Sequence, residues 1–285
     1  MSTYRINFKQ LRQRPDLLEM LAALERGFAA FHVDFYLVGA VARDIWMTAI
    51  NEIPPSRITR DIDFAVFIED KGIYEKLKRH LIEIGHFQPS IENNFVLFWQ
   101  GRMQVDLLPF GNIEDEHAKL SLEGTGLTSL NMPGFKEIYE SGLPEVELEG
   151  EHRFKFCTLP GIVILKLIAW EDRPEIRRDD LKDILTILTH FFEMYTDQIY
   201  EHHSDLFGDD DFGLHLIAAR VMGREMKKIA MRNEKLYERL TNLLEKNTMD
   251  VNTSEIGKIL ANMANTTVAE SLKPLVEIQL GFQGD

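Results

Sequence analysis

The stretch SRITRDIDFAVFIED, residues 56–70, has two aspartates inside a segment that otherwise has the composition of a buried strand. On the two-residue period of a strand, one face carries four apolar side chains, those of Ile62, Phe64, Val66 and Ile68. Asp61 and Asp63 lie on the opposite face, together with Ala65 and Phe67. Because aspartate is depleted in strands, the pair points to a function for this face.

The two carboxylates are expected to act at one site. Residues i and i+2 of a strand have Cα atoms about 6.6 Å apart, so both side chains can lean toward a single point. Two like charges at this distance repel each other unless a cation or a proton intervenes. We therefore interpret Asp61 and Asp63 as ligands of a metal ion.

A second strand supplies a third carboxylate. In MQVDLLPF, residues 103–110, Asp106 interrupts an apolar strand whose opposite face carries Val105 and Leu107. A single buried aspartate can be a structural residue that accepts hydrogen bonds from backbone donors. Three carboxylates on neighbouring strands would be costly without a cation, so Asp106 together with the first two predicts a divalent metal site.

A phosphate site is expected where the strand at 34–39 meets the helix at 40–50. Gly39 leaves room for a phosphate to approach the backbone, and the start of the helix offers unpaired amides. The alternative for Gly39 is a tight turn between strand and helix. A phosphate cradle followed by strand carboxylates is what nucleotide transfer with two Mg²⁺ ions requires, with Mn²⁺ as an alternative.

Composition and charge limit the class of protein. The chain has 285 residues, 45% of them hydrophobic, with a net charge of −14 and one cysteine, Cys157. The charge argues against a surface that binds nucleic acid broadly, although a local basic groove is compatible with it. No segment reaches the roughly 18 apolar residues of a membrane span. A lone cysteine, expected as a packed thiol, agrees with a cytoplasmic location.

The sequence changes character near residue 158. Before it, short apolar strands alternate with helices, and after it the pattern is almost wholly helical. We expect an α+β fold, with a small mixed sheet flanked by helices and a helical lead-in over residues 1–157, and a C-terminal helical domain over residues 158–285. The acidic segment EVELEGE, residues 145–151, is interpreted as a solvated turn.

The individual elements follow from periodicity and turn residues. Strands are expected at 34–39, at 61–68, at 152–159, and as a hairpin whose turn is Gln100 and Gly101. Helices are expected at about 40–50, 70–85, 160–172, 175–194, 211–232, 234–246 and 253–264.

Several of these segments resemble the nucleotidyltransferase superfamily, which has the polymerase β-like fold. The resemblance rests on LVGAVARD (37–44), RITRDIDFAVF (57–67) and MQVDLLPF (103–110). With LPGIVILKLIAWEDR (159–173) and DDLKDILTIL (179–188), the chain is more narrowly similar to the AbiEii and type IV toxin nucleotidyltransferases. The segment VARD is also similar to a motif of tRNA CCA-adding enzymes and poly(A) polymerases.

The resemblance implies a role for each matching residue. Asp61 and Asp63 would bind the catalytic metals, and Asp106 would be a third ligand and the base toward the acceptor hydroxyl. The implied nucleotide-binding residues are Gly39, Ala40, Arg43, Arg57, Thr59, Lys166 and Asp183. In this set, Lys166 would reach the triphosphate and Asp183 would orient it.

The residues alone leave alternatives for three of these assignments. Lys166, in the apolar helix GIVILKLIAW, can be a side chain that extends its ammonium group to solvent, and Asp183 can be surface charge. Arg43 and Asp44 are neighbours on a helix and are expected to face different directions.

The resemblance implies an enzyme that transfers NMP from an NTP to an acceptor hydroxyl and releases pyrophosphate. A toxin-like role would add an antitoxin as partner, with a tRNA 3′ end or a protein side chain as acceptor. One alternative is a small-molecule nucleotidyltransferase of the aminoglycoside-modifying type, whose acidic surface would attract a cationic substrate. Another is a non-catalytic binding protein, which Ala40 favours because glycine or serine is expected at that position.

Overall fold

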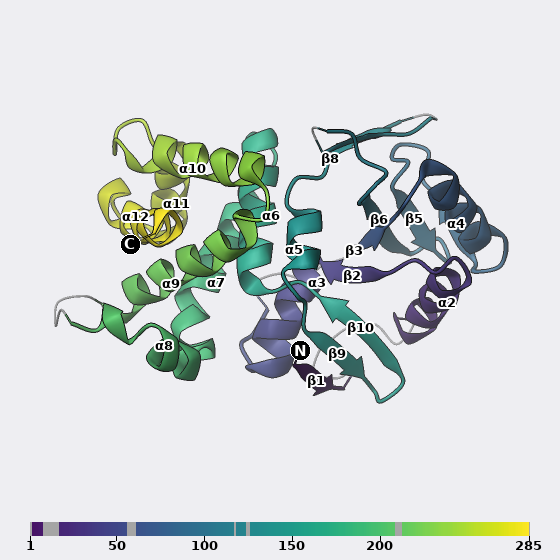
Figure 1. The fold of residues 1–285 in the computed structure, drawn as a ribbon, viewed down its shortest axis with the longest axis horizontal. Helices are drawn as coiled ribbons and strands as arrows, with labels where there is room; N and C mark the ends of the chain where they lie inside the picture. The colour runs from purple at the N-terminus through teal and green to yellow at the C-terminus, as the bar shows by residue number, and fades with distance from the viewer. Residues whose placement is uncertain are drawn as a thin grey trace. The chain divides into compact units, whose positions relative to one another are not determined.

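The structure, a computed structural model, describes most of the chain, namely residues 2–7, 17–55, 61–116, 118–123, 126–208 and 213–284. It divides into two compact units, residues 1–158 and 159–285 (Figure 1). The predicted α+β class is confirmed, since the first unit is built on a mixed sheet and the second is helical. Within the described residues, no helix is both long and apolar enough to cross a membrane.

An eight-stranded sheet forms the centre of the first unit over its described residues. The strands are β1 (Thr3–Ile6), β2 (Phe35–Val38), β3 (Asp61–Phe67), β4 (Phe87–Pro89), β5 (Val96–Trp99), β6 (Met103–Phe110), β9 (Glu145–Leu148) and β10 (His152–Phe156). Their order across the sheet is β1-β9-β10-β2-β3-β6-β5-β4. Strand β3, which carries Asp61 and Asp63, is therefore a central strand, antiparallel to β2 and parallel to β6. A separate hairpin joins β7 (Lys119–Ser121) to β8 (Ser129–Asn131).

The apolar face of β3 is covered by helices α2 (Leu17–Ala30) and α4 (Lys71–Glu83). The ring of Phe28 in α2 packs edge-on against Phe64 in β3, with 6.2 Å between the ring centroids. Tyr74 in α4 donates its hydroxyl to the carbonyl oxygen of Leu107 in β6, at 2.9 Å. The face predicted to be buried is thus buried, and the opposite face is left for the aspartates.

The predicted hairpin is confirmed: β5 and β6 are antiparallel, and Gln100 and Gly101 are the central residues of the turn between them, which Arg102 closes by donating its backbone N–H to the carbonyl oxygen of Trp99 at 2.9 Å. Both central residues have positive φ, 48° and 67°, which suits a tight turn between right-twisted strands.

The interpretation of residues 145–151 as a solvated turn is wrong for their first half. Residues 145–148 form β9, which lies between β1 and β10 and buries Val146 and Leu148 completely. The two glutamates of this strand point the other way, and each pairs with an arginine of a neighbouring strand, Glu145 with Arg153 and Glu147 with Arg5. Because side chains alternate between the two faces of a strand, this acidic segment still buries its two apolar residues.

The helix after β2 begins as α3 (Gly39–Asp44) and continues as a π-helix, Ile45–Ile50. Every residue from 40 to 49 is buried, so the helix runs through the interior of the unit. Trp46 donates its indole N–H to the carbonyl oxygen of Cys157 at 2.9 Å. The thiol of Cys157 is fully buried, which raises its pKa well above the usual range, so the predicted packed thiol is confirmed.

The second unit consists of helices over its described residues. They are α6 (Leu159–Asp172), α7 (Arg178–Met194), α8 (Thr196–His202), α9 (Leu214–Ala230), α10 (Glu234–Thr248), α11 (Glu255–Ala264) and α12 (Val268–Gln283). The sequence predicted all of them except α8 and α12. Helices α9 and α12 pack so closely that a Cβ atom added at Gly223 would lie 2.8 Å from the backbone nitrogen of Phe282.

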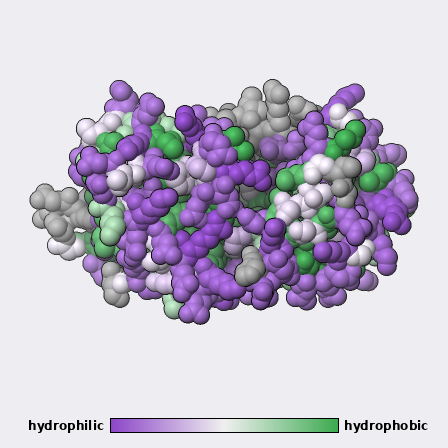
Figure 2. Space-filling view, turned by 90° about the horizontal axis from the view of Figure 1, so that it is seen from above, coloured by the Kyte–Doolittle hydropathy of each residue, from purple (hydrophilic) through white to green (hydrophobic). Residues whose placement is uncertain are grey.

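On the face drawn in Figure 2, hydrophilic side chains predominate and hydrophobic ones occur in small separate groups. This distribution agrees with the charge of −14, since acidic side chains outnumber basic ones by 46 to 32 in the whole chain. Such a surface is typical of a protein that stays dissolved by charge repulsion.

Glu114 gives the first unit a pH-dependent stability. This half-buried carboxylate accepts a hydrogen bond from the backbone N–H of Gly111 at 2.8 Å, and burial, with a contribution from the nearby charge of Glu137, raises its pKa from 4.5 to about 7. Between these two pH values the unfolded chain releases a proton that the folded chain keeps, so stability falls as the pH rises. At about 1.36 kcal/mol per pKa unit the full loss would be about 3 kcal/mol, and partial solvent exposure reduces it to about 1 to 2 kcal/mol.

We therefore expect Glu114→Gln to be more stable than the wild type by about 1 to 2 kcal/mol at pH 8, with the difference vanishing near pH 4.5. Urea unfolding of both proteins across this range measures it. The control is Glu83→Gln, which removes the same charge at an exposed position of α4. A constant difference for Glu114→Gln would contradict the assignment.

Candidate active site

The face of β3 and β6 opposite to α2 and α4 changes character along the strands. Near one end, the rings of Phe67 and Phe110 pack against Tyr139 of α5 (Phe135–Glu140), with centroid distances of 5.7 and 5.5 Å to the tyrosine. Toward the other end, the same face carries the three predicted carboxylates, Asp61, Asp63 and Asp106. The aromatic end closes the core, and the acidic end is half-buried.

Two of the three carboxylates are brought together by the sheet. Asp63 and Asp106 are direct partners in the parallel pairing of β3 and β6, so their side chains project from the same face of strands about 4.8 Å apart. Asp61 pairs instead with Gln104, and the side-chain amide of Gln104 donates to Asp106 Oδ1 at 2.8 Å. Asp61 is thus one pleat away from the pair.

The three carboxylates of the predicted metal site, Asp61, Asp63 and Asp106, do not form one compact group. In the part of the chain that the structure describes, no three His, Cys, Asp or Glu side chains are grouped to hold a metal. Asp63 and Asp106 nevertheless suit Mg²⁺, which commonly takes one or two protein carboxylates and completes its shell with water and substrate phosphates. The pair therefore fits a divalent cation that takes its remaining ligands from outside the protein.

Gly39 is fixed in place by Asp63. Val38, the last residue of β2, pairs with Asp63, and Gly39 follows it with φ +68° at the start of α3. A methyl group on Gly39 would overlap the carboxylate of Asp63 and lie 2.9 Å from its Cγ. The left-handed backbone and the close approach therefore both require glycine, and they place the first turn of α3 beside the acidic pair.

We expect Gly39→Ala to lower the free energy of unfolding by about 2 kcal/mol or more, from the strained φ and the overlap together. Chemical unfolding measures it. Asp63→Ala in the same background should recover part of the loss, because it removes the carboxylate that the methyl group meets. Strict additivity of the two substitutions would contradict the contact between Gly39 and Asp63.

Arg43 and Asp44 do not face different directions as predicted. Arg43 is buried, and its Nε and Nη2 donate to Asp44 Oδ1 at 2.9 and 2.7 Å. The long arginine side chain folds back along the helix at the point where α3 gives way to the π-helix. A buried guanidinium needs such a partner, so this ion pair has a structural role in the interior.

The other proposed nucleotide-binding residues of the first unit lie beside or outside this region. Ala40 is buried, with 6% of its surface exposed, so its side chain packs into the interior. Arg57 and Thr59 fall outside the described residues. Their predicted role remains a prediction.

In the second unit, Lys166 and Asp183 form a buried ion pair. Lys166 Nζ lies 2.7 Å from Asp183 Oδ2 and 2.8 Å from Asp180 Oδ1. Lys166 is 7% exposed and Asp183 is fully buried, so the alternatives of a solvent-directed lysine and a surface carboxylate are both wrong. Asp180 Oδ2 has no hydrogen-bond partner among the described residues, and Arg177 Nη1 approaches it to 3.8 Å.

Sequence reasoning missed Gln104 and Asp180. Gln104 precedes Asp106 by two residues, the spacing that puts both side chains on one face of a strand. Asp180 precedes Asp183 by three residues, the spacing of neighbours on a helix. Both residues could have been recognised from their spacing to Asp106 and Asp183.

The comparisons with known proteins give fold-level similarities. No family model and no curated protein matches the sequence. Three solved structures illustrate the matches. An antigenic nucleotidyltransferase-like protein from Paracoccidioides brasiliensis is 11% identical, with 70% of this chain and 91% of that chain covered and a TM-score of 0.42. The antibiotic-resistance factor ANT(2″)-Ia, in complex with adenylyl-2″-tobramycin, is 10% identical, with 79% and 98% covered and a TM-score of 0.35.

The third is the CCA-adding enzyme of Thermotoga maritima complexed with tRNA, which is 14% identical, with 100% of this chain and 83% of that chain covered and a TM-score of 0.30. At these identities and TM-scores, the similarities do not establish a family or an activity for this chain. The candidate site must be judged on its own geometry.

Proposed function

We propose that this chain is a nucleotidyltransferase, which moves NMP from an NTP to an acceptor hydroxyl and releases pyrophosphate. The observation that carries the proposal is the pairing of Asp63 with Asp106 on adjacent parallel strands, with the carboxylate of Asp63 against Gly39 at the start of a helix. Like charges on neighbouring strands repel unless a cation lies between them, and the start of a helix beside them offers backbone amides to a phosphate. Both features have a use in nucleotide transfer.

Asp63 and Asp106 would hold a divalent cation, with Mg²⁺ as the first choice, and Asp61 would join them by a rotation of its side chain. When bound, such an ion neutralises the triphosphate and the charge that develops on it. The chain's own residues then position the reactants. In our proposal the turn at Gly39 faces the phosphates, and Arg43 braces the first turns of the helix through its bonds to Asp44.

Asp106 would accept the proton of the acceptor hydroxyl while the hydroxyl oxygen forms the new bond to the α-phosphorus of the NTP. The bond from the α-phosphorus to the bridging oxygen breaks at the same time, and pyrophosphate leaves. Gln104 supports this role, because its amide holds Asp106 Oδ1 at 2.8 Å and so limits the rotation of the carboxylate. A positioned base contributes typically about 10² to 10⁴-fold to such a proton transfer.

We propose a tRNA 3′ end or a protein side chain as the acceptor, in a toxin-like role with an antitoxin as partner. This finer assignment rests on the sequence resemblance over residues 37–67 and 159–188. A cationic small molecule such as an aminoglycoside is the second candidate acceptor, which the net charge of −14 favours.

Product analysis separates these acceptors. The purified protein is incubated with each α-labelled NTP, Mg²⁺ and, in parallel, total tRNA, a protein extract freed of nucleic acid, or an aminoglycoside such as tobramycin. We expect label in tRNA or in a protein band, and label in the aminoglycoside alone would replace the toxin-like role. If no acceptor is labelled with any NTP, the chain is a binding protein and the proposal fails.

A further inference from the structure

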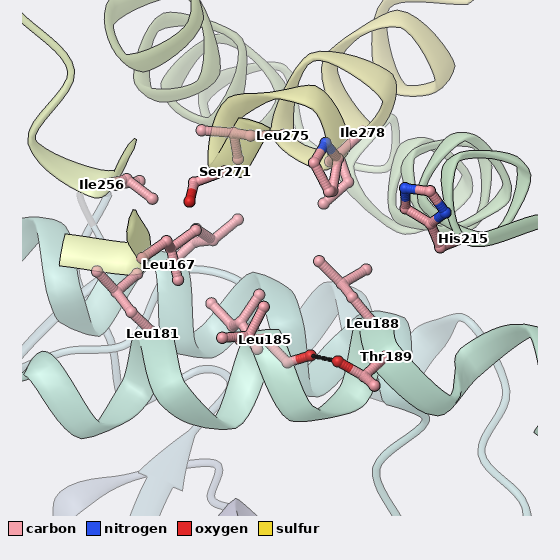
Figure 3. Close-up of a pocket in the computed structure, with 13 residues that line it drawn as sticks. Leu167, Leu181, Leu185, Leu188, Thr189, His215, Ile256, Ser271, Leu275 and Ile278 are labelled. Atoms are coloured by element: carbon pink, nitrogen blue, oxygen red, sulfur yellow. Dashed lines mark hydrogen bonds between the residues drawn. The ribbon is translucent and has the colours of Figure 1, made fainter. Parts of the chain in front are cut away.

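The helical unit contains a cavity of about 140 Å³ bounded by α6, α7, α9, α11 and α12 (Figure 3). Most of its wall is aliphatic, with side chains that include Leu167, Leu181, Leu185, Leu188, Ile256 and Ile278. The described residues that line it include no Asp, Glu, Lys or Arg. A charged molecule would lose its hydration there without gaining a partner of opposite charge, so the cavity suits a neutral one.

The cavity has a closed end and a mouth. Leu167, Leu181 and Ile256, at one end of the view in Figure 3, are almost completely buried. At the opposite end of the view, His215 and Thr189 are exposed, and Leu185, between the two ends, is half-buried. A small molecule can therefore enter at the end formed by His215 and Thr189.

One hydroxyl group distinguishes this cavity from a packing defect. Ser271 Oγ is buried, has no hydrogen-bond partner among the described residues, and points toward the space between Leu167 and Ile256 (Figure 3). Other hydroxyls of the helical unit donate to the carbonyl four residues earlier in several cases, as Thr189 does to Leu185 at 2.8 Å and Thr248 to Leu244 at 2.8 Å. Ser271 does not, so its hydrogen-bonding capacity is directed into the cavity.

We propose that this cavity binds a small neutral molecule with an apolar body, about the size of one aromatic ring, and one hydroxyl group that hydrogen-bonds with Ser271 Oγ. The size follows from the volume, because an aliphatic cavity of about 150 Å³ in a folded protein stays dry and binds benzene. The hydroxyl follows from Ser271, since buried polar groups in folded proteins almost always have a partner. This site is additional to nucleotide transfer and does not depend on it.

Phenol and toluene test the proposal, because they share a ring and differ in the hydroxyl. Each is titrated into the full-length protein by calorimetry, together with melting curves. We expect both to bind and to raise Tm. Ser271→Ala should weaken phenol binding about fivefold, as expected for one neutral hydrogen bond, and leave toluene binding unchanged or tighter. Without ligand, Ser271→Ala should melt higher, because it removes a buried hydroxyl without a partner.

Two tryptophan variants provide a matched pair. Leu185→Trp fills the middle of the cavity and should abolish the binding of both probes. Leu280→Trp places the same side chain on the exposed side of α12, where Leu280 is 43% exposed, and should bind both probes like the wild type. Absence of binding by the wild type at millimolar probe overturns the proposal, as does equal phenol affinity in Ser271→Ala or full binding by Leu185→Trp.

Discussion

Asp63→Asn is expected to reduce nucleotide transfer by at least about 10³-fold, because the ion that neutralises the triphosphate contributes several kcal/mol and about 1.36 kcal/mol corresponds to a factor of ten. Asp63 lies between the other carboxylate of the site, Asp106, and the turn at Gly39. Its Cα partner across β3 and β6 is Asp106, and its carboxylate lies against Gly39. Asparagine keeps the shape of the side chain and removes its charge. Single-turnover assays with an excess of enzyme measure the loss.

The same variant separates a metal ligand from a structural aspartate. If Asp63 binds metal, wild-type protein in EDTA holds two facing carboxylates, and Asp63→Asn should melt at the same temperature or higher. The wild type should gain about 2.7 kcal/mol from Mg²⁺ and a non-hydrolysable NTP at 100 times their Kd, and the variant should lose most of this gain. The control is Asp197→Asn, an exposed aspartate of α8, which should behave as the wild type.

A variant that melts lower than the wild type in EDTA and keeps its full ligand-induced shift would show a structural aspartate instead. In that case Asp63 stabilises the turn at Gly39 and has no part in nucleotide binding.

Lys166→Met is expected to lower the free energy of unfolding by about 3 to 5 kcal/mol, the range found when one partner of a buried ion pair is removed. Lys166 Nζ lies within 2.8 Å of an oxygen of each of two buried aspartates, Asp180 and Asp183. Methionine has nearly the same length without the charge, so the variant leaves two carboxylates in the interior without their cation. Urea unfolding measures the loss.

Lys182→Met is the matched control, because this lysine is exposed on α7 beside the cluster, and its loss should change stability by about 0.5 kcal/mol or less. Combining Lys166→Met with Asp183→Leu should recover part of the stability, since one buried charge is then removed with its partner. If Lys166→Met unfolds like the wild type, the cluster does not stabilise the unit. Loss of transfer without loss of stability would assign Lys166 to the nucleotide.

The sequence predicted the fold class and the centre of the sheet because their signals are local. In β3 one face is apolar at Ile62, Phe64 and Val66 and the other begins with Asp61 and Asp63, and this two-residue period indicates a strand with one buried face. The hairpin at Gln100 and Gly101 and the helices α7, α9, α10 and α11 likewise have periodic sequences, and α6 is a continuous apolar segment that is buried on almost every side. Each of these elements could be recognised from its own residues.

The elements that were missed carry a conflicting local signal. In β9 the glutamates mask the alternation of Val146 and Leu148, and their arginine partners come from other strands. Helix α12 contains Pro274 in its interior, a residue that normally ends a helix, and close packing on α9 compensates for it. In both cases contacts with other elements stabilise a structure that the local sequence does not predict.

The site was predicted in part for the same reason. That Asp63 and Asp106 share a face follows from strand periodicity, but their direct pairing depends on the register of β3 and β6, which no single segment fixes. The pairing of Arg43 with Asp44 depends on how the arginine side chain folds back in the interior, which the helical period does not predict. Side-chain geometry within a predicted site therefore required the structure.

The position of the transferred label tests nucleotide transfer most directly. Purified protein is incubated with Mg²⁺, total tRNA and protein extract, and with each NTP labelled in parallel at the α- or the γ-phosphate. We predict that α-label appears in a macromolecular product and γ-label in pyrophosphate, and that Asp63→Asn gives neither product. Transfer of the γ-label to an acceptor, or the same labelled product from Asp63→Asn as from the wild type, would contradict a nucleotidyltransferase built on Asp63 and Asp106.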